Sequence, residues 1–191
     1  MSPAPSFADK PELVGERVLL RPVRATDALG LVGMDAETLR LTGSHRTYGL
    51  EELENWYSTR ADHDDRLDLA IIERASGEWA GEVVLNDLDV DNRSCGFRIL
   101  LAGREYFGRG LGTEATRLVV AHGFETVGLH RIELEVYAFN PRARHVYENV
   151  GFAHEGVKRQ ALLWDGAWVD AHLMAIVADE WSALGGHPLP T

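Results

Sequence analysis

The stretch that decides the fold reads Gly108-Arg109-Gly110-Leu111-Gly112-Thr113. It follows an apolar run, Phe97 to Leu101, that is typical of a strand, and it opens a helical pattern from Gly110 to Val127. Because glycines carry no side chain, backbone N–H groups can approach an anion closely there, and a helix N-terminus adds about half a positive charge. The sequence therefore predicts a diphosphate cradle between a strand and a helix.

Two common phosphate-binding motifs do not fit this loop. A P-loop ends in Gly-Lys-Ser/Thr, which is not present here. A dinucleotide fingerprint spaces its glycines as Gly-x-Gly-x-x-Gly, whereas the glycines here stand at 108, 110 and 112. An ordinary tight turn is the alternative, so the interpretation depends on the rest of the chain.

Hydrophobic period and turn residues place further elements on both sides of the loop. Strands are expected at 18–23, 68–74, 79–86, 93–101, 131–137, 152–159 and 168–177, and helices after an N-cap at Thr26 and at 50–60, 110–127 and 141–150. The turns at 76–78 and 165–166 are too short for parallel crossovers. We therefore expect an α/β fold with a mixed, mostly antiparallel sheet of about seven strands and about four helices.

Length and composition suit one domain. The chain has 191 residues, 45% of them apolar, and we expect a single domain from 12 to 184 between flexible tails at 1–11 and 185–191. The sequence contains no apolar run of about 18 residues, so no membrane span is expected. The start lacks the basic and apolar regions of a secretory signal, and a single cysteine, Cys95, excludes an internal disulfide. These features predict a cytoplasmic protein.

Charge is negative and unevenly distributed. The net charge of −11 argues against a nucleic-acid partner. Residues 51–91 include thirteen acidic and three basic side chains, whereas residues 104–144 include five acidic and six basic ones. The first segment is either an ordinary solvated surface or a region that attracts a cationic substrate. The second segment would tolerate an anionic cofactor.

Four stretches resemble the GNAT superfamily of N-acetyltransferases, in particular its ribosomal-protein N-terminal acetyltransferase (RimJ/RimL-like) branch. They are RVLLRPVRATD at 17–27, YFGRGLGTE at 106–114, HRIELEVYAFNPRARHVYENVGF at 130–152 and DGAWVDAHLMAI within 165–181. The resemblance implies the GNAT fold, acetyl-CoA as co-substrate, and direct attack by an amine in a ternary complex. It also makes a homodimer possible.

The resemblance implies where acetyl-CoA is held. The pantetheine arm would pair with the strand edge at Ile99, Leu100 and Leu101, Asn140 would reach its amides, and Arg144 would approach a phosphate. The diphosphate would lie on the amides of Phe107, Gly108, Arg109, Gly110, Leu111, Gly112 and Thr113. One departure concerns Phe107, which stands where the superfamily often has Gln or Arg. The backbone and side chain of Arg109 are expected to compensate.

Tyr147 is the candidate general acid. Many members of the branch have Ser where this chain has Ala143. Tyr147 stands where other GNAT groups have a tyrosine that acts as the general acid. It follows Asn140 by about two helical turns, so both side chains share one face. A phenol with a pKa near 10 can protonate a leaving thiolate. Packing in the core is the alternative interpretation.

The general base and the acceptor site have several candidates. Glu82 and Glu135, each on a predicted strand, are candidate bases, and deprotonation through water alone is a further possibility. His45, Trp56 and Tyr57 fall where the family usually builds its acceptor site, although packing would explain them equally well. The eight histidines show no His-x-His or His-x-x-x-His ligand pair, so no metal site is expected.

Three classes of function remain open from the sequence. The acceptor amine belongs either to a cationic small molecule, such as a polyamine, amino sugar or antibiotic, or to a protein N-terminus. The third class is a non-catalytic acyl-CoA-binding module, or a transferase for a different acyl group. The acidic segment favours a cationic acceptor but does not separate a polyamine from a basic peptide.

Overall fold

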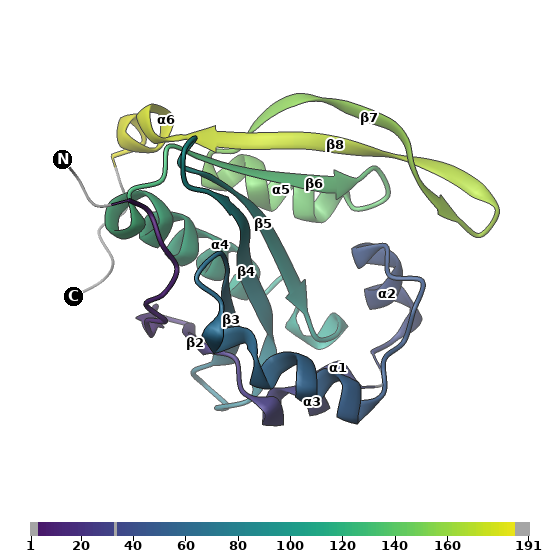
Figure 1. Cartoon of the computed structure of the whole chain (residues 1–191). Coiled ribbons are helices and arrows are strands. Elements are labelled where there is room, and N and C mark those ends of the chain that lie inside the picture. The colour runs from purple at the N-terminus through teal and green to yellow at the C-terminus, as the bar shows by residue number, and fades with distance from the viewer. Residues whose placement is uncertain (1–3, 33, 186–191) are drawn as a thin grey trace.

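An eight-stranded sheet in the order β1-β2-β3-β4-β5-β6-β8-β7 forms the centre of the computed structural model, which describes residues 4–32 and 34–185 (Figure 1). All neighbouring strands are antiparallel except β5 and β6. The strands are β1 (Leu13–Val14), β2 (Val18–Pro22), β3 (Leu67–Glu73), β4 (Trp79–Asp89), β5 (Ser94–Leu101), β6 (Arg131–Tyr137), β7 (Ala153–Trp164) and β8 (Ala167–Val177).

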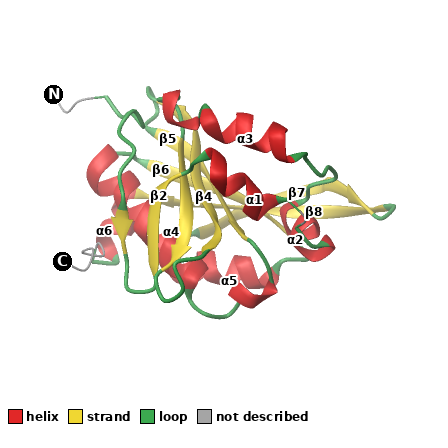
Figure 2. Cartoon of the chain, turned by 90° about the horizontal axis from the view of Figure 1, so that it is seen from below, coloured by secondary structure: helices red, strands yellow, loops and turns green. Residues whose placement is uncertain are grey.

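Helices cover both faces of the sheet. The α-helices are α1 (Ala28–Leu31), α2 (Ala36–Thr42), α3 (Leu50–Ser58), α4 (Leu111–Ala121), α5 (Pro141–Val150) and α6 (Ala178–Ala183). Short 3₁₀ turns are η1 (Ala25–Asp27), η2 (Arg60–Asp62) and η3 (Arg104–Tyr106), and η4 (His122–Val127) is a π-helical segment that continues α4. Figure 2 shows α1 and α3 on one face and α4 and α5 on the other. The predicted mixed α/β fold is confirmed, with one strand more than expected.

Each face of the sheet has its own apolar cluster. The larger one lies beneath α4 and α5 and includes Leu20, Val83, Ile132 and many other buried side chains. The smaller one gathers residues of α1, α3 and β3, among them Leu53 and Tyr57. Because successive side chains of a strand point to opposite faces, one set packs against α4 and α5 and the other against α3.

The parallel pair β5 and β6 separates soon after it begins, which positions the site. Its register is Ser94↔Arg131, Cys95↔Ile132 and Gly96↔Glu133, and no pairing continues beyond Gly96. From Phe97 onwards β5 stays paired with β4 only. The two strands visibly diverge towards their carboxyl ends in Figure 1. The second half of β5 therefore keeps one backbone edge without a neighbouring strand.

Two expectations about the amino-terminal part need correction. Thr26 is not a helix cap, because η1 begins after Arg24, whose backbone N–H donates to the carboxylate of Asp27 at 2.8 Å. Phe7 is fully buried, so the expected flexible tail to residue 11 is wrong for this segment. Met1–Pro3, and residues 186–191 of the other expected tail, lie outside the described residues. The sequence analysis also missed β1, α2 and α6, which have only 2, 7 and 6 residues.

Candidate active site

The glycine loop joins β5, through η3, to the N-terminus of α4. Gly110 is the N-cap of α4 with φ 82°, and Gly108 has φ 70°, so both occupy the left-handed region that glycine adopts without strain. Both residues are exposed, and a Cβ at Gly108 would meet no atom within 4 Å. The first backbone N–H groups of α4 have no acceptor within the helix, which is the arrangement that binds an anion.

The unpaired edge of β5 lies directly before this loop. Ala102 donates its backbone N–H to the carbonyl of Ala80 at 2.9 Å, and the β4–β5 register is regular from Gly81↔Leu101 back to Asn86↔Gly96. In an antiparallel pair the bonded residues alternate. The backbone groups of Ile99 and Leu101 therefore point away from β4, towards the space that β6 leaves. A polyamide chain could pair with them as an added strand.

Arg109 does not compensate for the missing cation at Phe107 with its side chain. The guanidinium pairs with the buried carboxylate of Glu73 at the end of β3, and it also reaches the carbonyl of Glu105 at 3.3 Å. The side chain is thereby tied to residues beside the loop. Only the backbone N–H of Arg109 remains a candidate contact for a diphosphate.

Asn140 and Arg144 occupy the first turns of α5. The side chain of Asn140 caps this helix by accepting the backbone N–H of Ala143 at 3.1 Å, which leaves its amide N–H groups free to donate. Arg144 pairs with Glu148 one turn later at 2.9 Å. Asn140 follows β6, so it stands across the strand divergence from β5. Asn140 therefore keeps amide N–H donors available, whereas the guanidinium of Arg144 is engaged with Glu148.

Tyr147 points from α5 into the apolar cluster. Its ring makes edge contacts with Phe97 of β5, at 5.7 Å between centroids, and with Phe152, at 6.0 Å. Burial raises the pKa of its phenol above the usual value near 10. No described residue forms a hydrogen bond with the hydroxyl. The ring is thus held beside the divergent half of β5 by packing, and it stays protonated at neutral pH.

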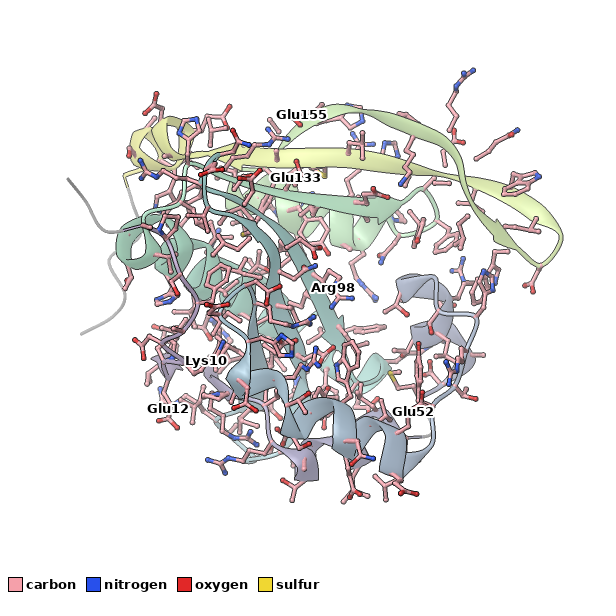
Figure 3. The ribbon with its side chains drawn as sticks, viewed as in Figure 1. Lys10, Glu12, Glu52, Arg98, Glu133 and Glu155 are labelled. Atoms are coloured by element: carbon pink, nitrogen blue, oxygen red, sulfur yellow. The ribbon has the colours of Figure 1, made fainter. Side chains whose placement is uncertain are left out.

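Glu82 and Tyr57 form a pair that no sequence motif predicted. The Tyr57 hydroxyl, on α3, donates to the Glu82 carboxylate on β4 at 2.5 Å. Glu82 stands directly opposite Leu100 in the β4–β5 register. Burial raises the pKa of Glu82, while the Tyr57 hydrogen bond and Arg98 on β5 oppose that rise. Figure 3 shows Arg98 near the centre of the molecule, beside the divergence of β5 and β6.

The other predicted site residues contact different partners. Glu135 is exposed on β6 and pairs with Lys158 of β7 at 3.1 Å. The ring of His45 stacks on Trp164, near the tip of the β7–β8 hairpin, at 4.9 Å between centroids. Trp56 is half exposed under the guanidinium of Arg60, at 3.9 Å from the ring centroid. Of the three predicted acceptor residues, only Tyr57 meets a candidate catalytic group.

Two contacts join α2 to the carboxyl end of β6. The guanidinium of Arg40 lies over the ring of Phe139, which follows β6, at 4.5 Å from the centroid. A Cβ at Gly43 would fall 2.5 Å from the ring of Tyr137, so a side chain there would require this ring to move. The sequence contained a signal for α2 that we had not used, because Asp35 caps it and Gly43 ends it with φ 68°.

A free strand edge followed by a glycine loop at a helix N-terminus is an arrangement that can hold an extended cofactor with a diphosphate. The comparisons identify the family. The model for the "Acetyltransferase (GNAT) domain" matches residues 17–153. The chain therefore belongs to the GNAT acetyltransferase family, as its sequence predicted, and it is an N-acetyltransferase with acetyl-CoA as co-substrate.

Two of the similar proteins have names that specify different acceptors. Spermidine N(1)-acetyltransferase of Escherichia coli is 29% identical over 87% of this chain and 89% of its own length. The ribosomal protein uS5-alanine N-acetyltransferase of Escherichia coli is 31% identical over 42% of this chain and 41% of its own. The structure of spermidine N-acetyltransferase from Vibrio cholerae with CoA and spermine superposes with a TM-score of 0.79 at 22% identity, covering 88% of this chain and 99% of that one.

The described residues contain neither a metal-binding cluster nor a membrane-spanning helix. Among residues 4–32 and 34–185, no three His, Cys, Asp or Glu side chains come together as a cluster that could hold a metal ion. Within the same residues, no helix is both long and apolar enough to cross a bilayer.

Proposed function

We propose that this protein transfers the acetyl group of acetyl-CoA directly to a primary amine, in a ternary complex at the divergence of β5 and β6. The observation that carries the proposal is that β5 loses its partner β6 beyond Gly96, on the stretch that leads through η3 to the glycine loop. The pantetheine arm would pair with Ile99 and Leu101, and the diphosphate would lie on the N-terminus of α4. The thioester would then lie between Glu82 on one face of the sheet and Tyr147 on the other.

The chemistry follows from these two groups. The amine attacks the thioester carbonyl carbon while Glu82, directly or through one water, accepts a proton from the nitrogen. A backbone N–H on the free edge of β5 stabilises the negative charge on the carbonyl oxygen. The C–S bond then breaks, and Tyr147 donates its phenolic proton to the departing thiolate. A raised pKa makes Glu82 a stronger base than an ordinary carboxylate. Glu135 is the weaker candidate because Lys158 already pairs with it.

A route through an acyl-cysteine is disfavoured by the state of Cys95. The thiol is buried, and burial raises its pKa to about 12. Because the thiolate is the nucleophilic form, the thiol would be almost unreactive at neutral pH. Direct attack by the amine therefore needs fewer assumptions than a two-step transfer.

For the acceptor we propose a small polyamine-like cation. Two observations support this proposal: the acidic segment at 51–91, and the much longer match to the spermidine enzyme than to the ribosomal-protein enzyme. A protein N-terminus is the competing acceptor. Both present a primary amine, so the family alone does not separate them.

A panel of amines tests this function. Spermidine, spermine, an amino sugar and basic peptides with free or blocked N-termini would be mixed with acetyl-CoA, and thiol release would be followed with Tyr147→Phe as the background control. We expect turnover with the polyamines and little with the peptides. Turnover of free-N-terminus peptides without turnover of polyamines would overturn the acceptor, and no turnover of any amine would overturn the proposed reaction.

A further inference from the structure

The starting observation is an arginine stacked on the residue that precedes the glycine loop. The guanidinium carbon of Arg142 lies 3.6 Å from the centroid of the Phe107 ring. Phe107 belongs to the segment between η3 and α4, whereas Arg142 is the second residue of α5. The contact therefore joins the two segments that follow β5 and β6, the strands whose divergence marks the site.

Arg142 differs from other arginines around α4 and α5 in having no protein acceptor. Arg109 pairs with Glu73, Arg144 pairs with Glu148, and Arg117 reaches the backbone carbonyl of Asn149 at 3.3 Å. Arg142 is exposed and forms no ion pair or hydrogen bond with any described residue. Stacking on a ring uses the flat face of the guanidinium, so the N–H donors around its edge stay available.

The position of Arg142 in the first turn of α5 also favours a nearby anion. A cation in the first turn of a helix is repelled by the positive end of the helix dipole. A negative ligand beside Arg142 would remove that repulsion and would interact with both charges. The neighbouring N-terminus of α4, with Gly108 and Gly110 exposed next to Phe107, already has the geometry of an anion cradle.

We propose that Arg142, held flat against Phe107, donates hydrogen bonds to the diphosphate of acetyl-CoA. The proposal rests on the placement of the diphosphate at the glycine loop, because Phe107 directly precedes Gly108. In this arrangement α5 supplies the cation that the loop lacks at position 107, while Arg109 holds Glu73. Phe107 acts as a positioning residue that keeps the guanidinium in one plane.

The test measures binding of CoA, dephospho-CoA and pantetheine by calorimetry. Both nucleotides contain the diphosphate, and pantetheine contains no phosphate. Arg142→Ala should weaken binding of both nucleotides by a similar factor, about 10- to 100-fold for a charge-assisted contact, and should leave pantetheine binding unchanged. Arg142→Lys keeps the charge without the flat fork, and Phe107→Leu keeps an apolar side chain without the ring. We expect an intermediate loss from each.

The controls separate this inference from the proposed function. Arg159→Ala removes an exposed arginine from β7 and should change none of the three affinities. Unchanged nucleotide binding in Arg142→Ala, or a loss confined to CoA with dephospho-CoA unaffected, would overturn the role at the diphosphate. If Gly110→Glu abolishes nucleotide binding in the same assay, the loop assignment survives such a result and only the role of Arg142 fails. If Gly110→Glu also binds normally, the loop assignment itself fails.

Discussion

The carboxylate of Glu114, in the first turn of α4, accepts the backbone N–H of Arg17 at 2.8 Å. The same carboxylate accepts the N–H groups of Glu16 at 2.8 Å and Val18 at 2.9 Å. One side chain thus ties the turn between β1 and β2 to the helix that follows the glycine loop. A Cβ at Gly15 would lie 2.7 Å from the Glu114 carboxyl carbon, so a side chain there would force this carboxylate to shift.

Removing this clamp should reduce stability. Glu114→Ala leaves three backbone donors without their acceptor, so we expect the free energy of unfolding to fall by about 1–3 kcal/mol. Chemical denaturation monitored by circular dichroism would measure the change. Glu51→Ala, at an exposed site on α3, is the matched control and should change stability little. Equal stability of the two variants would mean that water replaces the carboxylate at no cost.

A negative side chain in the glycine loop should abolish cofactor binding. Gly110→Glu would place a carboxylate beside the N-terminus of α4, where the diphosphate is proposed to lie, so we expect acetyl-CoA affinity to fall below detection in calorimetry. Gly166→Glu is a matched control, because Gly166 also has a positive φ, at 77°, and open space around it in the β7–β8 turn. Normal affinity in Gly110→Glu would refute the loop assignment.

The pH dependence of kcat/KM should report on Glu82. Because burial raises its pKa, the acidic limb of the profile should lie at higher pH than for an ordinary carboxylate with a pKa near 4.3. Tyr57→Phe removes a hydrogen bond that lowers this pKa, so the limb should move to still higher pH. Glu82→Gln should remove the limb and lower kcat by about 10²- to 10⁴-fold. A limb unchanged in Glu82→Gln would transfer the role of base to another group.

Glu82 should also affect stability in a direction opposite to most carboxylates. A pKa raised in the folded state means that the protein gains stability when the group is protonated and loses it as pH rises through the folded pKa. Glu82→Gln should therefore raise the melting temperature at neutral pH and change it less at acidic pH. Thermal unfolding at several pH values would measure this difference. A variant that melts below the parent at neutral pH would show that the Tyr57 bond outweighs the desolvation of the carboxylate.

Replacing Tyr147 by Phe should separate catalysis from packing. The ring contacts with Phe97 and Phe152 would persist, while the proton donor would be lost. We expect kcat to fall by about 10²- to 10⁴-fold, with acetyl-CoA affinity and melting temperature close to those of the parent. Tyr106→Phe, another buried tyrosine, serves as the control for loss of a hydroxyl. Parent-like turnover, with chemistry shown to be rate-limiting, would make Tyr147 a packing residue.

The sequence predicted what depends on neighbouring residues. Gly108 and Gly110 indicated the loop because positive φ angles and a helix start are local properties. Strand alternation and turn residues predicted the sheet for the same reason, while short elements such as α2 and β1 gave too few residues for a period to show. Thr26 was misjudged because the Arg21–Asp27 ion pair, at 2.8 Å, fixes the local turn through the sheet.

Only the tertiary structure decided how distant residues meet. Glu82 and Tyr57 are 25 positions apart, and their bond depends on α3 packing over β4. The stack of Arg142 on Phe107 depends on where β5 and β6 end relative to each other, which follows from a parallel pairing that stops at Gly96. By itself the sequence determined the family, the positive-φ glycine loop and the longer helices and strands, because these arise from local pattern. The contacts of Glu82 with Tyr57 and of Arg142 with Phe107 were decided by strand register and helix packing, which local pattern does not encode.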